Sequence, residues 1–575
     1  MVVNMADVNG TQPCNPASSN GDKYQIIEQE IHRRRKMRLI CVGAGIAGIA
    51  AAYKHMQRLQ DVELVIYEKN HDVGGTWLEN RYPGCACDIP AHGYTYSWEG
   101  NPNWSRFYVG AEEIHAYFKG CAIKWDCMKF IKLSHRVVRA QWSDEKSVWD
   151  LEIRNESDGS TFMDQCDVYL SATGVLNNWK WPDIPGLHSF QGLLVHSARW
   201  AEDYDFKDKT IAVIGAGSSA IQIVPELCKV SKRLFSFIRS STWITPEFSE
   251  SLAAQGRETR FSAEQIERFN QDKDYFLEYR KLVQNTGSSA FSLYYKGSEL
   301  QNQAVTNFTK LMRERLNYNE DLAEYLTPSF PVGCRRFTPG TGFLEALVKP
   351  DVTVVKSGMM QIEKDGIRTR DGQFYKVDAI VCATGFDCSF RPAFPVIGRN
   401  GKDLRDVWQE IPVHYMSVAV PGFPNYFITG GPNSPIANGS LIAGLETEID
   451  YAYSCLEKLQ KENGLSMEVS IAATKDFMEH KDAAMENFVW SGNCKSWYKN
   501  GRVDGPVTGP WCGSTWHFMA ALREPRFEDY VVKYRNKNRF AYMGHGRTIG
   551  ELRGDDLATH LREPGAGNMK TCDGL

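Results

Sequence analysis

The sequence predicts an α/β protein built from two Rossmann-like dinucleotide-binding units, with the second unit inserted in the first. The prediction rests on a strand, a glycine-rich turn and a helix that occur in this order twice, from residue 39 and again from residue 211. Such a turn opens the phosphate-binding helix of a doubly wound sheet. Length supports the same prediction, because 575 residues exceed the roughly 100–200 residues of one ordinary domain.

The first unit begins with an apolar strand at residues 39–42, which leads into Gly43-x-Gly45-x-x-Gly48 and a helix rich in alanine and isoleucine. The glycines allow a tight turn, a close approach of backbone to a pyrophosphate, and close packing of the helix, whose N-terminus adds partial positive charge. Glu68 ends the next strand, twenty residues after Gly48. A carboxylate there can bind both hydroxyls of a ribose that carries no 2′-phosphate, which favours FAD.

The second unit repeats the pattern after the strand at residues 211–214, with Gly215, Gly217 and Ala220 at the glycine positions. Its following strand ends in Arg239 and Ser240 where the first unit has an acid. An arginine beside hydroxyl groups suits a phosphate, so this unit is expected to prefer NADPH to NADH. Its candidate cofactor-binding residues are Gly215, Gly217, Ser218, Ser219, Arg239 and Ser240.

Two units with opposite charge at the ribose position predict that one chain holds FAD and NADPH, with electrons passing from nicotinamide to flavin. A helical segment whose apolar residues recur on one face follows the capping-box pair Ser262 and Gln265. The expected organisation is an N-terminal tail at 1–36, a first FAD-binding part at 37–175, an NADPH-binding domain at 176–384 with a helical insert at about 249–328, a second FAD-binding part at 385–545 and a C-terminal tail at 546–575.

Composition argues against several other classes of protein. A net charge of −4 and a pI near 6.4 give no basic footprint for nucleic acid. We expect neither a membrane span nor a secretory signal, because the apolar runs are too short for both. The 15 cysteines are scattered, apart from Cys85 and Cys87, which we expect to be packing residues. We therefore expect reduced cytoplasmic thiols rather than a disulfide framework, no metal site and, as the default, a monomer.

Two longer motifs resemble the class B flavoprotein monooxygenases, and among them the Baeyer-Villiger monooxygenases, over roughly residues 37–545. The string SFQGLLVHSARWAED, residues 189–203, matches a family fingerprint through Phe190, Gly192, His196 and Trp200. Ala201 departs from the Asp or Pro that usually follows this tryptophan. The string VGGTWLENRYPGCACDIP, residues 73–90, matches a second fingerprint through Gly74, Gly75, Trp77, Tyr82, Pro83, Gly84 and Asp88. Two long patterns in the right order are typical of this family.

The resemblance implies which residues lie beside the flavin. Trp77 would pack near the ring and Asp88 would point toward it, with Gly75 and Thr76 among the further contacts. Trp77 stands where a flavin-dependent disulfide reductase has the first cysteine of its redox pair. The flavin itself is therefore expected to carry the chemistry in place of a dithiol relay.

The resemblance also implies which positively charged residues belong to the site. In the segment 330–347, Arg335 would contact NADP and Arg336 would be the catalytic group, with Asp88 holding it in position. The segment 494–501 resembles a mobile loop that closes over NADP, with Trp497 as its inserted aromatic residue.

The activity implied is oxygen insertion into a ketone. Flavin reduced by NADPH would react with O2 at its C4a carbon, and the resulting peroxyflavin would attack the ketone carbonyl to give an ester or lactone. The main alternative is a monooxygenase of the same class that oxidises amine nitrogen or thioether sulfur, although Trp200 favours ketone oxidation. A non-catalytic binding protein on the same scaffold is a third possibility, against which the intact glycine loops argue. The strings GCRRFTPGTGFLEAL and GPWCGSTWHF, residues 333–347 and 509–518, look most like fungal members of the family that accept bulky or polycyclic ketones.

Overall fold

The computed structural model describes residues 24–247, 252–253, 259–558 and 561. The chain forms two compact bodies, and both nucleotide-binding units belong to the larger one. The smaller one comprises the segments up to Arg33 and from Asn536, and it contains helix α14 (Ile549–Arg553). The larger one, Arg34–Arg535, contains all elements discussed below. In the described part of the chain, no helix combines the length and apolar character that crossing a membrane requires.

The first glycine-rich turn belongs to a parallel sheet whose strand order is β3-β2-β1-β7-β19. The strands are almost entirely apolar because helices cover the sheet, and the residues 39–42 of β1 are at most 6% exposed. Helix α1 packs on β1 and β2 and contacts α3 and α11. The bounds are β1 Met37–Val42, β2 Val62–Tyr67, β3 Ile131–Lys132, β7 Val168–Ser171, β19 Tyr426–Ile428, α1 Ile46–Arg58, α2 Thr76–Glu79, α3 Ala111–Lys124 and α11 Leu441–Lys461.

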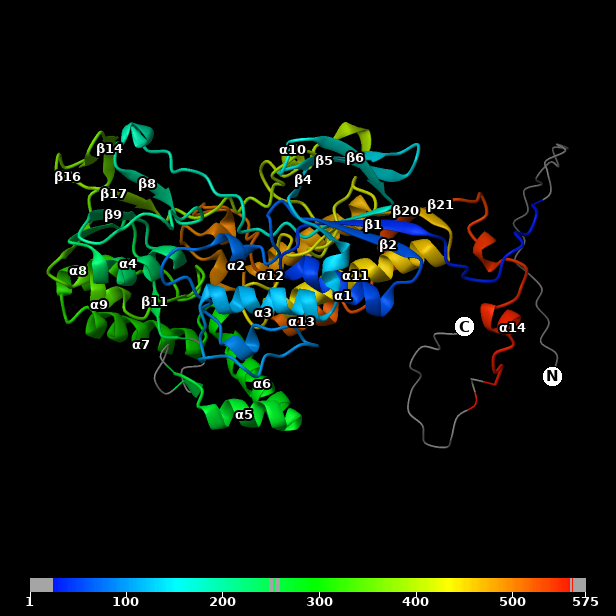
Figure 1. The fold of residues 1–575 in the computed structure, drawn as a ribbon, viewed down its shortest axis with the longest axis horizontal. Helices are drawn as coiled ribbons and strands as arrows, with labels where there is room; N and C mark the ends of the chain where they lie inside the picture. The colour runs from blue at the N-terminus through cyan, green and yellow to red at the C-terminus, as the bar shows by residue number, and fades with distance from the viewer. Residues whose placement is uncertain (1–23, 248–251, 254–258, 559–560, 562–575) are drawn as a thin grey trace, which may run out of the picture. The chain divides into compact units, whose positions relative to one another are not determined.

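The second turn belongs to another parallel sheet, with the order β13-β10-β9-β17-β8. All its strands lie between β7 and β19 in the sequence, so the second unit is inserted in the first, which confirms the predicted fold class. Figure 1 shows β8, β9 and β17 grouped with α4, α8 and α9, apart from β1 and β2. The bounds are β8 Leu193–His196, β9 Thr210–Ile214, β10 Arg233–Phe237, β13 Val352–Val355, β17 Ala379–Cys382, α4 Ser218–Val230 and α9 Phe343–Leu347.

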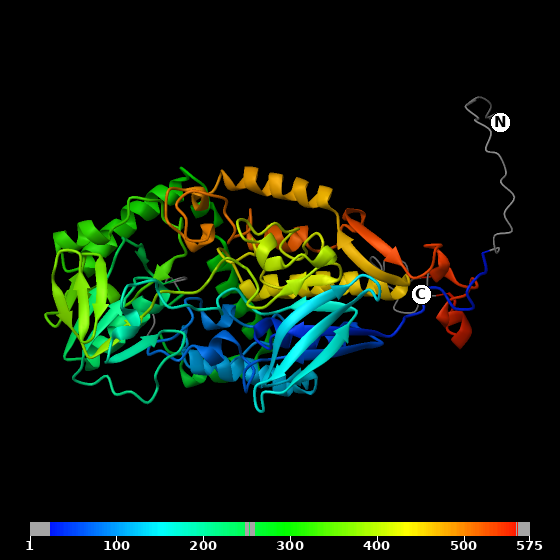
Figure 2. The ribbon, with the colours of Figure 1, turned by 90° about the horizontal axis from the view of Figure 1, so that it is seen from above.

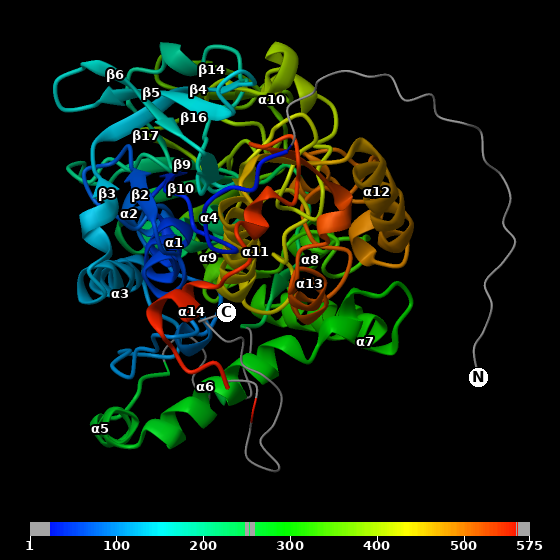
Figure 3. The ribbon, with the colours of Figure 1, turned by 90° about the vertical axis from the view of Figure 1, so that its right-hand side faces the viewer.

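A helical lobe is inserted in this second unit. Helices α5 and α6 project from the rest of the unit in two orthogonal views (Figures 1 and 3). Ser262 caps α5 by accepting a hydrogen bond from the backbone nitrogen of Gln265, as the capping pattern predicts. The predicted insert begins in residues 249–251 and 254–258, which lie outside the described part of the chain. The bounds are α5 Ala263–Gln271, α6 Lys273–Ser288, α7 Glu299–Arg315 and α8 Glu320–Leu326.

The lobe is anchored on an aromatic cluster. Phe261, Phe269, Phe276 and Tyr279 surround the imidazole of His92, with ring centroids 4.9–5.8 Å away. Burial lowers the pKa of His92 to about 3, so the ring is neutral in this apolar setting. The apolar face of the predicted helical segment is therefore core, as expected.

Smaller elements complete the larger body, Arg34–Arg535. Figure 2 shows the strands β4–β6, in cyan, and the helix α12, in orange, on opposite sides of it. The bounds are β4 His135–Ser143, β5 Val148–Asn155, β6 Thr161–Cys166, β11 Ile244–Thr245, β12 Thr338–Pro339, β14 Met359–Glu363, β15 Gly366–Thr369, β16 Phe374–Lys376, β18 Val396–Ile397, β20 Gly464–Val469, β21 Tyr530–Tyr534, α10 Leu404–Val407, α12 Ile471–Met485 and α13 Thr515–Ala521.

The cysteines differ in one respect from the expectation of reduced thiols. Cys334 and Cys494 form a disulfide, so the prediction of reduced thiols is wrong for this pair. The two residues are 160 positions apart in the sequence, and their Cα atoms lie 6.4 Å apart only after folding, which is why spacing alone could not reveal the pair. Cys87 is buried and Cys85 is half-buried.

Candidate active site

The two glycine loops have the same local geometry. Gly43 has φ 108°, and a Cβ added to it would meet the carbonyl oxygen of Ala172 at 2.5 Å. Gly215 has φ 128°, and its Cβ would meet the carbonyl oxygen of Ala383 at 2.4 Å. Each loop thus passes directly against the turn that follows a neighbouring strand, β7 or β17. Any larger residue would push the loop away from that turn.

The remaining glycines allow either close packing of the helix or space for a phosphate group. A Cβ on Gly48 would meet the carbonyl oxygen of Gly43 at 2.0 Å, so this glycine allows α1 to pack against its own loop. A Cβ on Gly45 would contact only the backbone of Gly75, at 3.6 Å, and one on Gly217 would contact nothing within 4 Å. Space at the start of α1 and α4, combined with helix N-terminal charge, fits a dinucleotide pyrophosphate at each loop.

Glu68 lies at the ribose position of the first loop. Its side chain is buried, and its two oxygens accept hydrogen bonds from the backbone nitrogens of Ala44 at 2.7 Å and Asn70 at 2.9 Å. Burial raises its pKa, while both backbone bonds lower it. Each carboxylate oxygen can accept a second hydrogen bond. The carboxylate is therefore oriented and still able to bind the two hydroxyls of a ribose.

The second loop has cations at the corresponding place. Arg239 and Ser240 are exposed just after β10. Arg335 lies nearby: its Nη1 donates to the carbonyl of Ser241 at 3.2 Å, and its guanidinium lies 4.8 Å from the ring centroid of Phe330. Burial lowers the pKa of Arg335, and the charge of Arg239 lowers it further. Two like charges held close together fit an anionic group such as the 2′-phosphate of NADPH.

The predicted catalytic pair is in direct contact. Arg336 donates to Asp88 from Nε at 3.1 Å and from Nη2 at 2.9 Å, and its Nη1 donates to the carbonyl oxygen of Ile436 at 2.9 Å. Burial alone would lower the pKa of Arg336, but the Asp88 carboxylate raises it above its usual value. The guanidinium is therefore a permanent, oriented cation.

The contacts of Arg336 leave part of its charge available. A guanidinium has five N–H groups, and those directed at Asp88 and the Ile436 carbonyl do not use all of them. The side chain keeps 28% of its surface exposed, against 18% for Asp88. One side of the cation is thus anchored while the other can meet a ligand.

Tyrosines complete the surroundings of this pair, and the sequence did not single them out. Tyr498 is buried and lies close enough to Arg336 for the charge of the arginine to act on its hydroxyl: burial raises the pKa of Tyr498 to about 12, and Arg336 lowers it. Tyr94 accepts a hydrogen bond at 3.3 Å from the indole nitrogen of Trp77. Trp497 is only half-buried, with its ring centroid 4.7 Å from that of Tyr498. Tyr498, rather than the predicted Trp497, is therefore the residue of this loop that lies near Arg336. The sequence does not show this, because it does not show which of the two side chains points inward.

The stretch from Gly74 to Asp88 also joins the first nucleotide-binding unit to the second. Tyr82 donates to the side chain of Gln222 on α4 at 3.0 Å, and Gln222 donates to the carbonyl of Ala86 at 3.0 Å. A Cβ on Gly84 would meet the carbonyl oxygen of Gln222 at 2.7 Å. The Tyr-Pro-Gly part of the motif thus seats the second nucleotide helix beside the first unit, and it lies between Trp77 and Asp88 in the chain.

The fingerprint between the units has a structural role. His196 is fully buried at the end of β8; its Nδ1 accepts from the nitrogen of Ala198, and its Nε2 lies 3.3 Å from the hydroxyl of Thr384. Burial lowers its pKa to about 4, so the ring stays neutral. Trp200 stacks on Phe206, with centroids 5.0 Å apart. Phe190 packs with residues of β17, and a Cβ on Gly192 would meet the carbonyl oxygen of Asp378 at 2.4 Å, so these fingerprint residues shape the region around β8 and β17.

Comparisons with known proteins find relatives over most of the chain. Residues 36–307 match the family model described as flavin-binding monooxygenase-like. An FAD-binding monooxygenase of Aspergillus terreus is 38% identical over 534 residues, which cover 92% of this chain and 95% of the relative. A Baeyer-Villiger monooxygenase of Pseudomonas aeruginosa is 31% identical over 493 residues, covering 85% and 90% of the two chains.

Solved structures share the same arrangement. An oxidized steroid monooxygenase bound to NADP superimposes with a TM-score of 0.74 and 26% identity over 87% of this chain and 99% of that one. The cyclohexanone monooxygenase from Rhodococcus sp. Phi1 bound to NADP+ gives a TM-score of 0.75 at 22% identity, covering 87% of this chain and all of the other, which is a likeness of fold.

Proposed function

Because the chain belongs to the Baeyer-Villiger-type class B flavoprotein monooxygenases, we propose that it inserts one oxygen atom of O2 into a ketone and releases an ester or lactone. It takes FAD at the first glycine loop and NADPH at the second, where the acidic and basic ribose positions match the two cofactors. FAD reduced by NADPH supplies the activation of O2, which amino-acid side chains cannot provide.

The single observation that carries this proposal is the Arg336–Asp88 pair. The arginine comes from the segment that precedes β12 in the second unit, whereas Asp88 and the Ile436 carbonyl come from the first. A cation held at the meeting of the two nucleotide folds can stabilise negative charge that develops on oxygen during transfer to a carbonyl carbon. Because Asp88 orients the guanidinium beforehand, no reorganisation is needed at that moment.

Aromatic residues near the pair limit the access of water to it. Tyr498 and Trp77 are buried and Tyr94 is half-buried, and the charges of Arg336 and Asp88 act on both tyrosines. Exclusion of water strengthens the interaction of Arg336 with an anionic oxygen and suppresses loss of activated oxygen as hydrogen peroxide.

The experiment is a product analysis. Purified protein should carry FAD, or take it up, and should oxidise NADPH faster when a suitable ketone is present. A panel of linear, cyclic and polycyclic ketones is incubated with enzyme, NADPH and air, and the products are identified by mass spectrometry. An ester or lactone that is one oxygen atom heavier than its ketone supports the proposal. The same panel with no converted ketone, on a protein that does oxidise NADPH, contradicts it.

The alternative within the class is oxidation of amine nitrogen or thioether sulfur. It needs the same cofactors, so NADPH consumption does not separate the two reactions. Including amines and thioethers in the panel does: N-oxides or sulfoxides formed without any ester or lactone would move the function to this alternative. A protein that cannot be reconstituted with FAD would instead support the non-catalytic reading.

A further inference from the structure

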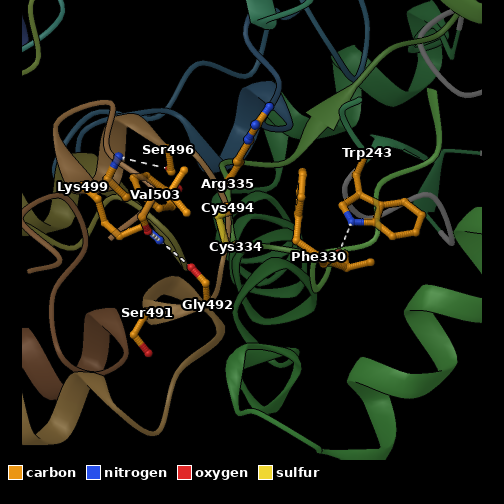
Figure 4. Close-up of a disulfide and its surroundings, with 12 residues drawn as sticks. Trp243, Phe330, Cys334, Arg335, Ser491, Gly492, Cys494, Ser496, Lys499 and Val503 are labelled. Carbon is orange, nitrogen blue, oxygen red and sulfur yellow. Dashed lines mark hydrogen bonds between the residues drawn. A yellow bond between two sulfur atoms is a disulfide. The ribbon is translucent and has the colours of Figure 1, made fainter. Parts of the chain in front are cut away.

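The Cys334–Cys494 disulfide joins two segments of the site that are far apart in the sequence. Cys334 lies two residues before Arg336, and Cys494 lies four residues before Tyr498. Figure 4 shows the sulfur bridge between the segment that carries Arg335 and the segment that carries Ser496 and Lys499. The disulfide joins the two segments covalently, and Tyr498 of one segment lies within electrostatic range of Arg336 of the other.

Hydrogen bonds within and beside the 494–501 loop couple the position of Cys494 to that of Tyr498. The ammonium of Lys499, on a side chain that is almost completely buried, donates to the carbonyl oxygens of Gly492 and Val503 on either side of the loop. The Ser496 hydroxyl accepts from the nitrogen of Tyr498 at 3.1 Å. The backbone of the loop closes on itself through the nitrogen of Gly501 and the carbonyl of Ser496, 2.9 Å apart. A shift at Cys494 is thus transmitted to Tyr498.

Packing at the bridge allows little adjustment. Cys334 is 0% exposed and Cys494 2% exposed. A Cβ added to Gly492 would lie 3.3 Å from the Cys334 sulfur, so the backbone just before the 494–501 loop approaches the bridge closely. A covalent link between residues 160 positions apart also removes much of the freedom that two separate surface segments would have.

We propose that the Cys334–Cys494 disulfide positions the 494–501 loop, and Tyr498 within it, against Arg336, so that the loop covers the arginine whether or not NADP is bound. Reduction of the disulfide releases the loop and diverts activated oxygen from product to hydrogen peroxide. The second statement rests on the proposed function, whereas the first concerns the loop alone. Cys334, Cys494 and Tyr498 are positioning residues in this account, because they act through Arg336.

The chemistry of release is a thiol–disulfide exchange with a dithiol. One thiolate of the dithiol attacks a sulfur of the bridge, the S–S bond breaks, and the other cysteine leaves as a thiolate that takes up a proton. The second thiol of the reagent then displaces the first cysteine, so that two cysteine thiols and one oxidised dithiol result from a transfer of two electrons and two protons. Because both sulfurs are buried, the exchange requires the loop to move first.

The test begins with hydrogen exchange, which needs no substrate. The parent enzyme with FAD bound is compared before and after treatment with dithiothreitol, and the state of each cysteine is read by thiol alkylation and mass spectrometry. We expect backbone amides at 494–503 to exchange about tenfold faster after reduction, in the absence of NADP, because the local opening free energy falls. NADP+ should restore protection in the reduced protein. Equal exchange before and after reduction, or free thiols at both positions in the untreated protein, would overturn the positioning role.

Variants then separate positioning from general stability. Cys334→Ser together with Cys494→Ser should show fast exchange at 494–503 without any reductant, and dithiothreitol should change nothing further. Cys388→Ser is the matched control, because it removes a buried free thiol elsewhere and should respond to dithiothreitol as the parent does. Chemical reduction of the parent gives the same information if the double variant does not fold.

The second measurement is the share of activated oxygen that is lost as hydrogen peroxide instead of reaching product. In the reduced parent, the ratio of hydrogen peroxide formed to NADPH consumed should rise several-fold while flavin reduction proceeds at the parent rate. Tyr498→Phe keeps the ring but removes the hydroxyl near Arg336, so it should raise the peroxide ratio with little change in exchange. An unchanged peroxide ratio in both cases would overturn the link to oxygen transfer. If exchange responds to reduction but no ketone is ever converted, the proposed function fails while the positioning role of the disulfide stands.

Discussion

Replacing Arg336 separates the two halves of the reaction. Transfer of hydride depends on the stacking of nicotinamide and flavin, which the two glycine loops and the grip on the 2′-phosphate determine. Oxygen transfer depends on the cation that Asp88 and the Ile436 carbonyl hold in place. Arg336→Ala should therefore still oxidise NADPH, whereas the rate of ester or lactone formation should fall by about 10²–10³, the usual effect of removing one preorganised partner of a developing oxyanion.

The substitution also has a stability cost that must be separated from catalysis. Asp88 is only 18% exposed, and Arg336→Ala leaves it without three hydrogen bonds. Breaking a buried pair on one side costs about 3–5 kcal/mol, and the partial exposure of this pair places it toward the lower end. Arg336→Ala combined with Asp88→Asn removes the unpaired charge, so the double variant should regain stability but not product formation.

The assay measures NADPH, hydrogen peroxide and product in the same reaction, together with the unfolding temperature of the FAD-bound protein. Arg335→Ala is the matched control from the same segment: it should raise the Michaelis constant for NADPH and leave the share of oxygen that reaches product nearly unchanged. Arg336→Lys keeps the charge but not the planar fork, so partial rescue at best is expected. Product formation by Arg336→Ala at near the parental rate would refute the reasoning and make Arg335 the next candidate.

Two further predictions concern the nucleotide and the pH dependence of stability. Arg239→Ala should raise the Michaelis constant for NADPH about ten- to hundredfold, because a charge-assisted hydrogen bond contributes about 1.5–3 kcal/mol, and should barely affect NADH; equal losses with both nucleotides would exclude the 2′-phosphate contact. Burial raises the pKa of Glu448, which accepts from the nitrogen of Gly430 and the hydroxyl of Ser434, from its ordinary 4.5 to about 8. The folded state therefore keeps a proton that the unfolded chain releases, and this stabilisation, complete below about pH 4.5, is lost as pH rises to about 8. Glu448→Gln should gain in unfolding temperature relative to the parent over that range, at up to about 1.4 kcal/mol per pH unit; a difference that does not vary with pH would contradict the assignment.

The fold could be predicted because local patterns define it. Each glycine loop combines a strand, a turn that requires φ above zero at Gly43 or Gly215, and a helix, and the structure shows these elements in the predicted order. The insertion of one sheet in the other followed from the same repeat. The contact between Arg336 and Asp88 was expected only from the family resemblance, since the two residues are 248 positions apart.

The rest of the site could not be predicted from local patterns. Cys334 and Cys494 belong to segments that meet only in the folded chain, and neither has a neighbouring cysteine that would mark a pair. Tyr498 lies near the arginine because its side chain is buried, whereas that of Trp497 lies half-buried beside it. The direction of a side chain in an irregular loop depends on tertiary contacts, which periodicity does not encode.

The most direct test of the central claim traces the oxygen atom. Enzyme, FAD and NADPH are mixed with a ketone that the panel shows to be converted, under labelled O2 in ordinary water, and the product is analysed by mass spectrometry. We expect an ester or lactone that carries one labelled atom in the newly formed C–O–C linkage, with the original carbonyl oxygen unlabelled. Label absent from that position, or incorporated only when the water is labelled, would contradict insertion of oxygen from O2 by this protein.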